Sequence, residues 1–327
     1  MIVLSLFDGI SCGMLALKRA GIPVTTYFAS EVDKHSIIVS QKNFPEIVHI
    51  GDVRNISYQQ GKLYVNNDVV YDGVIDLLIG GSPCQSLSVA GDGTGLDGKS
   101  NLFFEYVRLK NEIQPAYWLL ENVKMKREWE DILSAELDTN PTLINSNIFS
   151  AQHRQRNYWT NINIPAIPLI GGQTLEDILE KDISPDFYLS CKAVEYMDRE
   201  TRDGRSHWDF EHHSDTWHEK SRAVVANFYK GVPYNVLIDR RESKCDWYEC
   251  DFQASDVCAG CVDRDCYQSK YIPTKVVRHF TPTECERLQT LPDGYTDGVA
   301  KTHRYKMIGN GWTVDVIAHI FKGMIPK

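Results

Sequence analysis

The chain has 327 residues, of which 43% are hydrophobic and 24% charged, values typical of a globular protein with a substantial core. No apolar run approaches the ~18 residues of a membrane helix and no basic leader opens the chain, so we expect a cytoplasmic protein without membrane contact. The net charge of −9 argues against nonspecific coating of nucleic acid, although a local basic cleft stays possible. Nine cysteines, five of them within residues 245–266, do not suit a secreted disulfide scaffold.

Short apolar runs alternate with helix-like segments from residue 1 to about 160. This alternation predicts an α/β fold with a doubly wound, mostly parallel sheet, whose ligands bind at the carboxyl ends of the strands. The predicted strands are Ile2–Leu6, Thr25–Ala29, Ile47–Ile50, Ile75–Ile79, Tyr117–Leu120 and Tyr158–Ile162, and helices are predicted from about Met14, over Asn101–Ile113 and over Lys126–Leu137.

The second half of the chain is less regular. Residues from about 165 to 275 are rich in Pro, His, Trp and Cys of mixed charge. Thr281-Pro282-Thr283-Glu284 then predicts a capped helix to about Leu291, and a last amphipathic helix is expected from Trp312 to about Met324. We therefore expect a large α/β domain over residues 1–165, a smaller irregular domain over 166–300, and a return to the large domain over 301–327.

Three strand ends carry residues that suit an adenosine-containing ligand. A glycine-bearing loop from Phe7 to Gly13 follows the first strand, but its spacing differs from that of a dinucleotide pyrophosphate site. Glu31, eighteen residues after Gly13, is placed as an acid that binds ribose hydroxyls, and Asp52 with Val53 suits an adenine edge. Together they indicate adenosine without phosphate; the alternative is that Glu31 and Asp52 are solvated loop acids.

The next two strand ends supply a nucleophile and an acid. Cys84 follows the fourth predicted strand and Glu121 the fifth, while Arg154 and Arg156 precede the sixth. Each has a plain alternative, as a core cysteine or a surface charge. As a set they suit chemistry on a cytosine ring. A thiolate that adds at C6 activates C5. A carboxylic acid can stabilise the ring at N3 and the exocyclic amine, and an arginine can hold O2.

In this order, the segments resemble those of the DNA cytosine-5 methyltransferases over nearly the whole chain. The loop Phe7-Asp8-Gly9-Ile10-Ser11-Cys12-Gly13 resembles the form of the cofactor loop found in the vertebrate de novo enzymes. The other matching segments are Glu31, Gly51-Asp52-Val53, Gly80-Gly81-Ser82-Pro83-Cys84-Gln85, Glu121-Asn122-Val123, Gln152-x-Arg154-x-Arg156, Arg278–Glu284 with Leu288–Pro292, and Gly309-Asn310-Gly311-Trp312-Thr313-Val314.

The resemblance implies a class I, Rossmann-like methyltransferase that binds S-adenosyl-L-methionine and double-stranded DNA. It implies that cytosine is turned out of the duplex, that Cys84 attacks C6, and that C5 then receives the methyl group. The catalytic residues it implies are Pro83, Cys84, Gln85, Glu121, Arg154 and Arg156. The cofactor-binding residues it implies are Phe7, Asp8, Gly9, Ile10, Ser11, Cys12, Glu31, Asp52, Val53, Asn310, Gly311 and Trp312.

The glycine-rich segment 91–100 fits the P-loop pattern at Gly93 and Gly98-Lys99-Ser100, but no strand runs directly into it. The resemblance implies instead a lid that closes over the flipped base. Within the family, residues 166–300 would form the target recognition domain. Its cysteine cluster either holds structural zinc, through Cys250, Cys258, Cys261 and Cys266 with Cys245 as an alternative ligand, or consists of free packed cysteines.

Two other functions stay open at this point. A tRNA cytosine-5 methyltransferase would share the fold, but the Ser-Val-Ala-Gly sequence after the nucleophile and the long recognition insert favour DNA. A catalytically inactive DNA-binding relative would be expected to lack the nucleophile or the cofactor loop, and this chain has both. A bacterial or phage origin is expected, and protein partners are not indicated.

Overall fold

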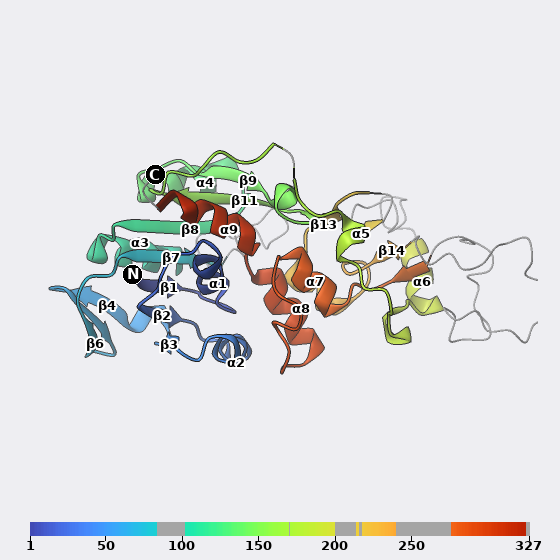
Figure 1. Cartoon of the computed structure of the whole chain (residues 1–327), viewed down its shortest axis with the longest axis horizontal. Helices are drawn as coiled ribbons and strands as arrows, with labels where there is room; N and C mark the ends of the chain where they lie inside the picture. Colours follow the sequence, from blue (N-terminus) through green and yellow to red (C-terminus); the bar gives the residue numbers. More distant parts are fainter. Residues whose placement is uncertain (84–101, 170, 200–213, 216–217, 240–275, 325–327) are drawn as a thin grey trace, which may run out of the picture.

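The structure of the chain, a computed structural model, is drawn in Figure 1. Its described residues are 1–83, 102–169, 171–199, 214–215, 218–239 and 276–324. The lid segment, the cysteine cluster and the nucleophile Cys84 with Gln85 therefore lie outside the described residues. Within those ranges, no helix combines the length and apolar character needed to cross a bilayer.

A seven-stranded sheet organises the first half of the chain, in the order β3-β2-β1-β7-β8-β11-β9. The first five strands in this order are parallel, and β11 is antiparallel to both of its neighbours. The predicted fold class, a mostly parallel α/β sheet, is confirmed. The strands are β1 (Ile2–Leu6), β2 (Thr26–Ser30), β3 (Val48–His49), β7 (Leu77–Gly81), β8 (Tyr117–Val123), β9 (Thr142–Asn145) and β11 (Gln155–Thr160).

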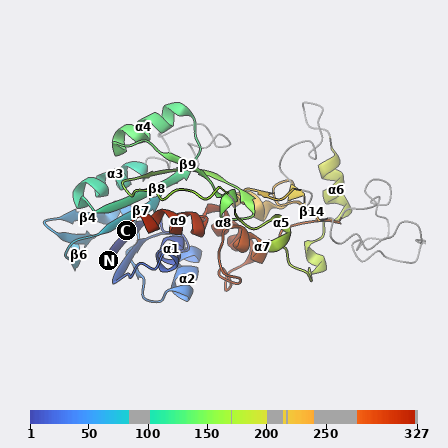
Figure 2. The same cartoon turned by 45° about the horizontal axis from the view of Figure 1, so that its top comes forward.

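Helices cover both faces of this sheet, as Figure 2 shows. Successive strand residues point to opposite faces, so that Val3 joins one apolar cluster and Leu4 the other. The last helix returns to the sheet and packs on the first, with a 2.7 Å ion pair between Arg19 and Asp315. One face carries α1 (Cys12–Arg19), α2 (Lys34–Asn43) and α9 (Val314–Phe321), and the other carries α3 (Leu102–Ile113) and α4 (Arg127–Leu137).

The strand predicted at Tyr158–Ile162 begins three residues earlier, at Gln155. It is paired on both sides, with β8 and with β9, and this pairing extends the strand through polar residues that carry no apolar signal. The register sets Arg156 opposite Val123 and Tyr158 opposite Glu121. A residue of the predicted arginine motif therefore reaches the carboxyl end of β8.

A three-stranded antiparallel meander was not expected from the sequence. It consists of β4 (Ile56–Gln59), β5 (Lys62–Val65) and β6 (Asp68–Asp72). Its two turns hold Gln60 and Gly61 at φ 51° and 77°, and Asn66 and Asn67 at φ 51° and 71°. Two consecutive residues with positive φ angles are typical of tight β-hairpin turns. The pairs Asn66-Asn67 and Gln60-Gly61 could therefore have indicated the two hairpins from the sequence.

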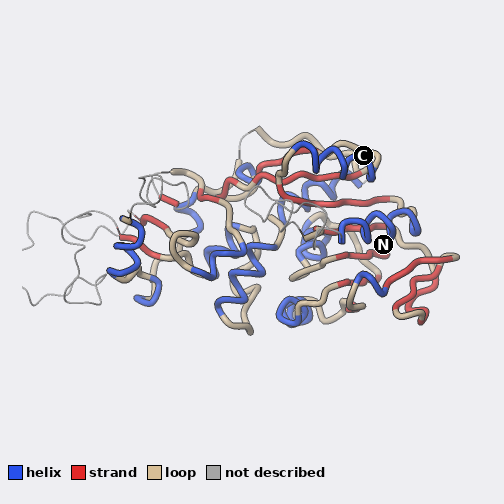
Figure 3. Tube along the Cα trace, turned by 180° about the vertical axis from the view of Figure 1, so that it is seen from behind, coloured by secondary structure: helices blue, strands red, loops and turns tan. Residues whose placement is uncertain are grey.

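The remaining elements gather at the other end of the molecule, which Figure 3 shows from behind. The predicted capping box is confirmed, with reciprocal bonds between Thr281 and Glu284, although the helix ends at Leu288. Fully buried Arg278 pairs with Asp239 at 3.0 Å and with Glu284 at 2.8 Å. The domain boundaries at 165 and 300 stay a prediction. These elements are α5 (Leu175–Ile178), α6 (Cys191–Asp198), α7 (Pro282–Leu288), α8 (Lys301–Asn310), β10 (Gln152–His153), β12 (Ser214–Asp215), β13 (Ser221–Arg222), β14 (Leu237–Asp239) and β15 (Val276–Arg278).

Short 3₁₀ helices complete the described structure. They are η1 (Val53–Asn55), η4 (Ser146–Ile148), η5 (Pro185–Phe187), η6 (Ala226–Lys230) and η8 (Lys322–Met324). The expected closing helix, Trp312 to Met324, is thus α9 followed by η8, and Trp312 lies before its first turn. This placement leaves the indole of Trp312 outside the helix and next to the strand ends.

Candidate active site

The loop after β1 is bent by three left-handed residues. Phe7, Gly9 and Ser11 have φ angles of 56°, 59° and 61°, of which only the glycine adopts its conformation without strain. The turn is closed by a 3.1 Å bond from the Ser11 amide to the Asp8 carbonyl. It brings the backbone from the sheet edge into α1 and exposes it around Gly9, where an added Cβ would meet nothing within 4 Å.

The side chain of Asp8 holds this loop from the inside. Its carboxylate accepts hydrogen bonds from Ser5 at 2.6 Å, Tyr27 at 2.7 Å and Ser11 at 2.5 Å. Burial raises the pKa of Asp8 to about 6, against the lowering effect of these three hydroxyl donors. Asp8 was predicted to bind the cofactor; the structure shows its carboxylate bonded to protein groups that set the shape of the loop.

Glu31 lies at the end of β2 with its carboxylate fixed by three backbone amides. One oxygen accepts from Gly9 at 2.8 Å, and the other from Val32 at 2.7 Å and Asp33 at 2.8 Å. The first bond joins the predicted ribose acid to the predicted cofactor loop. Val32 was not predicted as a site residue. Its apolar side chain is 70% exposed beside this carboxylate. The sequence feature that could have pointed to it is its position directly after Glu31.

Asp52 and Val53 follow β3, as predicted. The Asp52 carboxylate caps η1 through the Arg54 amide at 3.0 Å and pairs with the Arg54 guanidinium at 2.5 Å. These contacts with Arg54 keep the pKa of Asp52 low. Val53 is buried, and the Gly51 carbonyl is held by the Ser30 hydroxyl at 2.8 Å. The segment is thus rigid and adjoins the end of β2.

Glu121, Arg156 and Trp312 meet at the carboxyl end of β8. Glu121 is 8% exposed, and one of its oxygens pairs with Arg156 Nε at 3.0 Å. The other accepts the indole N–H of Trp312, also at 3.0 Å. The structure therefore joins two predicted catalytic residues with one predicted cofactor residue around a single carboxylate.

The turn that leads to the nucleophile is tied to the same strand. Asn122 donates to the hydroxyl of buried Ser82 at 3.0 Å and to its carbonyl at 3.4 Å. Pro83 follows, half-buried, and is the last described residue before Cys84. The described part of this turn therefore lies beside the Glu121 carboxylate, and an added Cβ on Gly81 would come within 3.2 Å of Glu121 Oε2.

Arg154 has a different environment from Arg156. It is buried, and its guanidinium donates to the carbonyls of Val224 at 2.6 Å, Gly309 at 3.1 Å and Gly311 at 2.9 Å. These bonds tie the start of β11 to the region before η6 and to the carboxyl end of α8. The predicted catalytic role of Arg154 therefore stays a prediction. The contacts of its side chain in the structure are hydrogen bonds that hold backbone segments together.

A buried amide network, not foreseen as functional, supports this junction. Gln152 donates to the side chain of Gln289 at 3.0 Å, and Gln289 also accepts from Thr313 at 2.8 Å and donates to the Gly311 carbonyl at 3.1 Å. It thereby holds the segment with Asn310 and Gly311. Cys12 packs against that segment, and burial raises the pKa of its thiol to about 12.

The proposed zinc ligands Cys245, Cys250, Cys258, Cys261 and Cys266 all lie outside the described residues. Among the residues that are described, no group of three or more His, Cys, Asp or Glu is placed to hold a metal ion. The zinc site accordingly stays a prediction.

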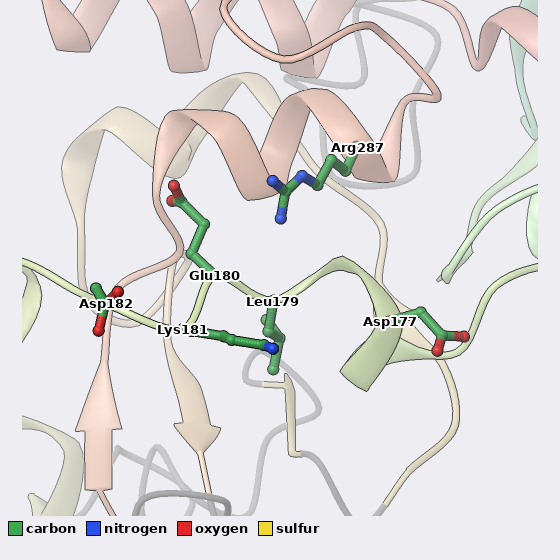
Figure 4. Close-up of a pocket in the computed structure, with 6 residues that line it drawn as sticks. All are labelled: Asp177, Leu179, Glu180, Lys181, Asp182 and Arg287. Atoms are coloured by element: carbon green, nitrogen blue, oxygen red, sulfur yellow. The ribbon is translucent and has the colours of Figure 1, made fainter.

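A surface pocket of about 500 Å³ lies between the end of α5 and α7, with Arg287 facing Leu179 and Glu180 (Figure 4). Arg287 is already bonded to the Ile178 carbonyl at 2.9 Å and to Asp293 at 2.6 Å. None of the predicted site residues lines this pocket. The predicted site residues instead lie at the strand ends of the large sheet.

Comparison with known proteins agrees with this geometry. A family model for C-5 cytosine-specific DNA methylases matches residues 1–326. The chain belongs to this family. The roles of the individual site residues stay predictions.

Several methyltransferases of bacteria and their phages are relatives. The Type II methyltransferase M.HpaII of Haemophilus parainfluenzae is 26% identical over 99% of this chain and 89% of its own length. M.FnuDI of Fusobacterium nucleatum is 27% identical over 98% and 93%. The orphan methyltransferase M.SPRI of Bacillus phage SPR is 38% identical over 125 residues, a match that spans 37% of this chain and 26% of the phage protein.

Solved structures share the fold. The Entamoeba histolytica methyltransferase EhMeth superposes with a TM-score of 0.69 at 15% identity, covering 100% of this chain and 99% of that one. The Dnmt2 methyltransferase of S. pombe gives 0.65 at 15% identity, covering 98% and 97%. At such low identity the likeness supports the fold class alone.

Proposed function

We propose that this methyltransferase transfers a methyl group from S-adenosyl-L-methionine to C5 of a cytosine in double-stranded DNA, at a short specific sequence and through a transient bond from Cys84 to C6. The observation that carries the proposal is the Glu121 carboxylate, which Arg156 and Trp312 hold at the end of β8 beside the turn that leads to Cys84. The family match over residues 1–326 supports the same chemistry.

The residues at the ends of β1 and β2 fit the proposed methyl donor. The Gly9 backbone is open to a ligand. Three amides fix the orientation of the Glu31 carboxylate and leave one acceptor site, on Oε2, for a ribose hydroxyl. Exposed Val32 offers an apolar surface suited to an adenine ring. When bound, S-adenosyl-L-methionine supplies the methyl group for C5.

The protein residues would then act on the cytosine. The Cys84 thiolate forms a bond to C6, and the electron pair displaced from the C5–C6 double bond makes C5 nucleophilic. As a carboxylic acid, Glu121 would donate its proton to N3 as the adduct forms and accept a hydrogen bond from the exocyclic amine. Arg156 keeps the Glu121 carboxyl group in place. After C5 has gained the methyl group, loss of the C5 proton restores the double bond and breaks the bond from sulfur to C6.

Duplex DNA is the substrate that we favour over tRNA. The family's description names DNA, and exposed Lys124 and Lys126 directly follow β8. Phosphate groups of a duplex would be complementary to these two ammonium groups. The proposal places the enzyme in the cytoplasm of a bacterial cell, where such DNA is accessible. A tRNA substrate is the alternative that the experiment must separate.

The test incubates the protein with labelled S-adenosyl-L-methionine and either mixed-sequence duplex DNA or tRNA, and maps modified positions by sequencing. We expect 5-methylcytosine at one recurring short DNA sequence, and no transfer by Cys84→Ala. That variant should still bind S-adenosylhomocysteine in calorimetry, which shows that it is folded. Label in tRNA alone would contradict the DNA substrate, and a protein that binds the cofactor product but methylates neither nucleic acid would be an inactive relative.

A further inference from the structure

The indole of Trp312 lies in a slot between Gly81, which leaves room for its N–H edge, and the first turn of α1 at Gly13. A Cβ added at Gly81, the last residue of β7, would lie 2.9 Å from Trp312 Nε1. A Cβ added at Gly13, in the first turn of α1, would lie 3.5 Å from Trp312 Cζ3. The ring therefore spans from the helix that follows the cofactor loop to the strand end beside Glu121, where its N–H edge lies closest to Gly81.

The polar edge of this ring is engaged by Glu121. The indole N–H donates to Oε2 at 3.0 Å, while Arg156 Nε pairs with Oε1 at 3.0 Å. Rotation about the last side-chain bond of glutamate meets only a shallow, roughly two-fold energy barrier. A single hydrogen bond to one oxygen therefore leaves the plane of the carboxylate loosely defined. Two donors on opposite oxygens restrict that plane, and hydrogen bonds to an ionised group are the stronger kind.

We infer that Trp312 is a positioning residue for Glu121, which fixes the carboxylate in the orientation that the target cytosine must meet. The inference rests on the proposed function and deepens it, because sequence reasoning assigned Trp312 only to the cofactor. Its ring, packed at Gly13, can line the cofactor side while its N–H serves the base side. The indole thus lies between the predicted cofactor side and the predicted base side of the site and contacts both.

The decisive variant is Trp312→Phe, which keeps an aromatic ring in the slot and removes the N–H donor. We expect single-turnover methyl transfer to duplex DNA, at saturating cofactor and DNA, to fall about 10- to 100-fold, as for loss of one hydrogen bond to a charged group. S-adenosylhomocysteine affinity, measured by calorimetry, should change by less than about threefold, because the ring contacts stay.

Trp159→Phe is the matched control. Its indole N–H donates to the Ser134 hydroxyl at 3.0 Å from a fully buried position in β11, so the same donor atom is removed away from the site. This variant should retain the wild-type transfer rate. A second comparison serves if Trp312→Phe does not fold. Trp312→His carries a ring N–H donor and Trp312→Leu has none. Trp312→His should transfer methyl groups faster, and equal rates for the two folded variants would contradict the inference.

A double-mutant cycle distinguishes positioning from a general structural effect. In a Glu121→Gln background, Trp312→Phe should cause little further loss, because the group through which it acts is already altered. Unchanged transfer by folded Trp312→Phe, or fully additive losses in the cycle, would overturn the inference. Failure of the wild-type protein to methylate any nucleic acid would instead overturn the proposed function.

Discussion

The carboxylate of Asp8 holds the loop between β1 and α1 through hydrogen bonds. Three hydroxyl groups converge on it, and one of them, Ser11, continues to Ser40 at 2.6 Å and from there to His49 at 3.1 Å. The chain of bonds joins the loop after β1 to the end of β3. Removing the charge of Asp8 should therefore change the hydrogen bonds that hold the loop and the way in which the stability of the protein depends on pH.

The stability contribution of Asp8 depends on pH in a predictable direction. Its pKa rises from 3.8 to about 6 on folding because burial disfavours the charged form. The folded state therefore binds this proton more tightly than the unfolded chain, so its contribution is complete below about pH 4 and is lost as the pH rises through about 6. We expect the unfolding free energy of the wild type minus that of Asp8→Asn to fall across this interval.

Urea denaturation of both proteins between about pH 4 and pH 8 measures this difference. Subtraction is needed because Asp33 and Asp52 have lowered pKa values and oppose the trend equally in both proteins. A difference that stays constant with pH would show that Asp8 titrates normally in the folded protein.

At the scale of elements, the contact between α8 and η6 holds the small, irregular part of the chain against the segment that carries Trp312. Gly309 lies at this contact, and a Cβ there would come 2.2 Å from the backbone carbonyl carbon of Val225 and 2.3 Å from the amide nitrogen of Ala226. Backbone atoms cannot move aside as a flexible side chain can. The same Gly309 carbonyl accepts from Arg154.

Gly309→Ala is accordingly expected to destabilise the protein, by roughly 1 to 3 kcal/mol or more. Helix propensity alone predicts the opposite sign, a gain of up to about 1 kcal/mol for alanine over glycine. The urea midpoint therefore decides between the two effects. Thr302→Ala, at an exposed position of the same helix, is the control in which only propensity acts, and it should be neutral or stabilising.

At the scale of the whole molecule, charge is distributed unevenly. The chain carries a net charge of −9, yet Lys124 and Lys126 are exposed after β8 and form no ion pair within the described residues. They lie just before or at the start of α4, where the helix dipole disfavours cations. Arg222 and Lys220 form a second group of positive charge, and together with partial burial they lower the pKa of His153.

This distribution predicts the salt dependence of DNA binding. Each phosphate contact contributes about 0.9 to the slope of log affinity against log salt for duplex DNA, so Lys124→Gln or Lys126→Gln should lower the slope by about that amount. Lys62→Gln is the control of equal charge, since Lys62 pairs with Asp72 in the meander at 2.6 Å. Equal slopes for all three variants in fluorescence anisotropy titrations would refute a specific phosphate contact.

The order of elements and the main chemical groups could be predicted from the sequence. Apolar periodicity and turn residues are local properties, so β1 and the capped helix at Thr281 lie where they were expected. The extension of β11 was missed because its polar residues enter the strand through pairing with two neighbours, which is a tertiary property. The meander was missed because its turns, Gln60-Gly61 and Asn66-Asn67, were not read as hairpins. Cys84 and the cysteine cluster lie outside the described residues, and their roles stay predictions.

The sequence by itself determined the family, the acid at Glu31 and the loop that precedes α1, because these depend on residue type and spacing. Only the tertiary structure decided which side chains meet. Glu121 and Trp312 lie 191 positions apart, and their contact exists because Gly81 has no side chain that would fill the space at the indole N–H. Arg154 and Arg156 are alike in type and two positions apart, yet one is buried among backbone carbonyls and the other reaches Glu121, because the path of the chain into β11 turns them to different partners.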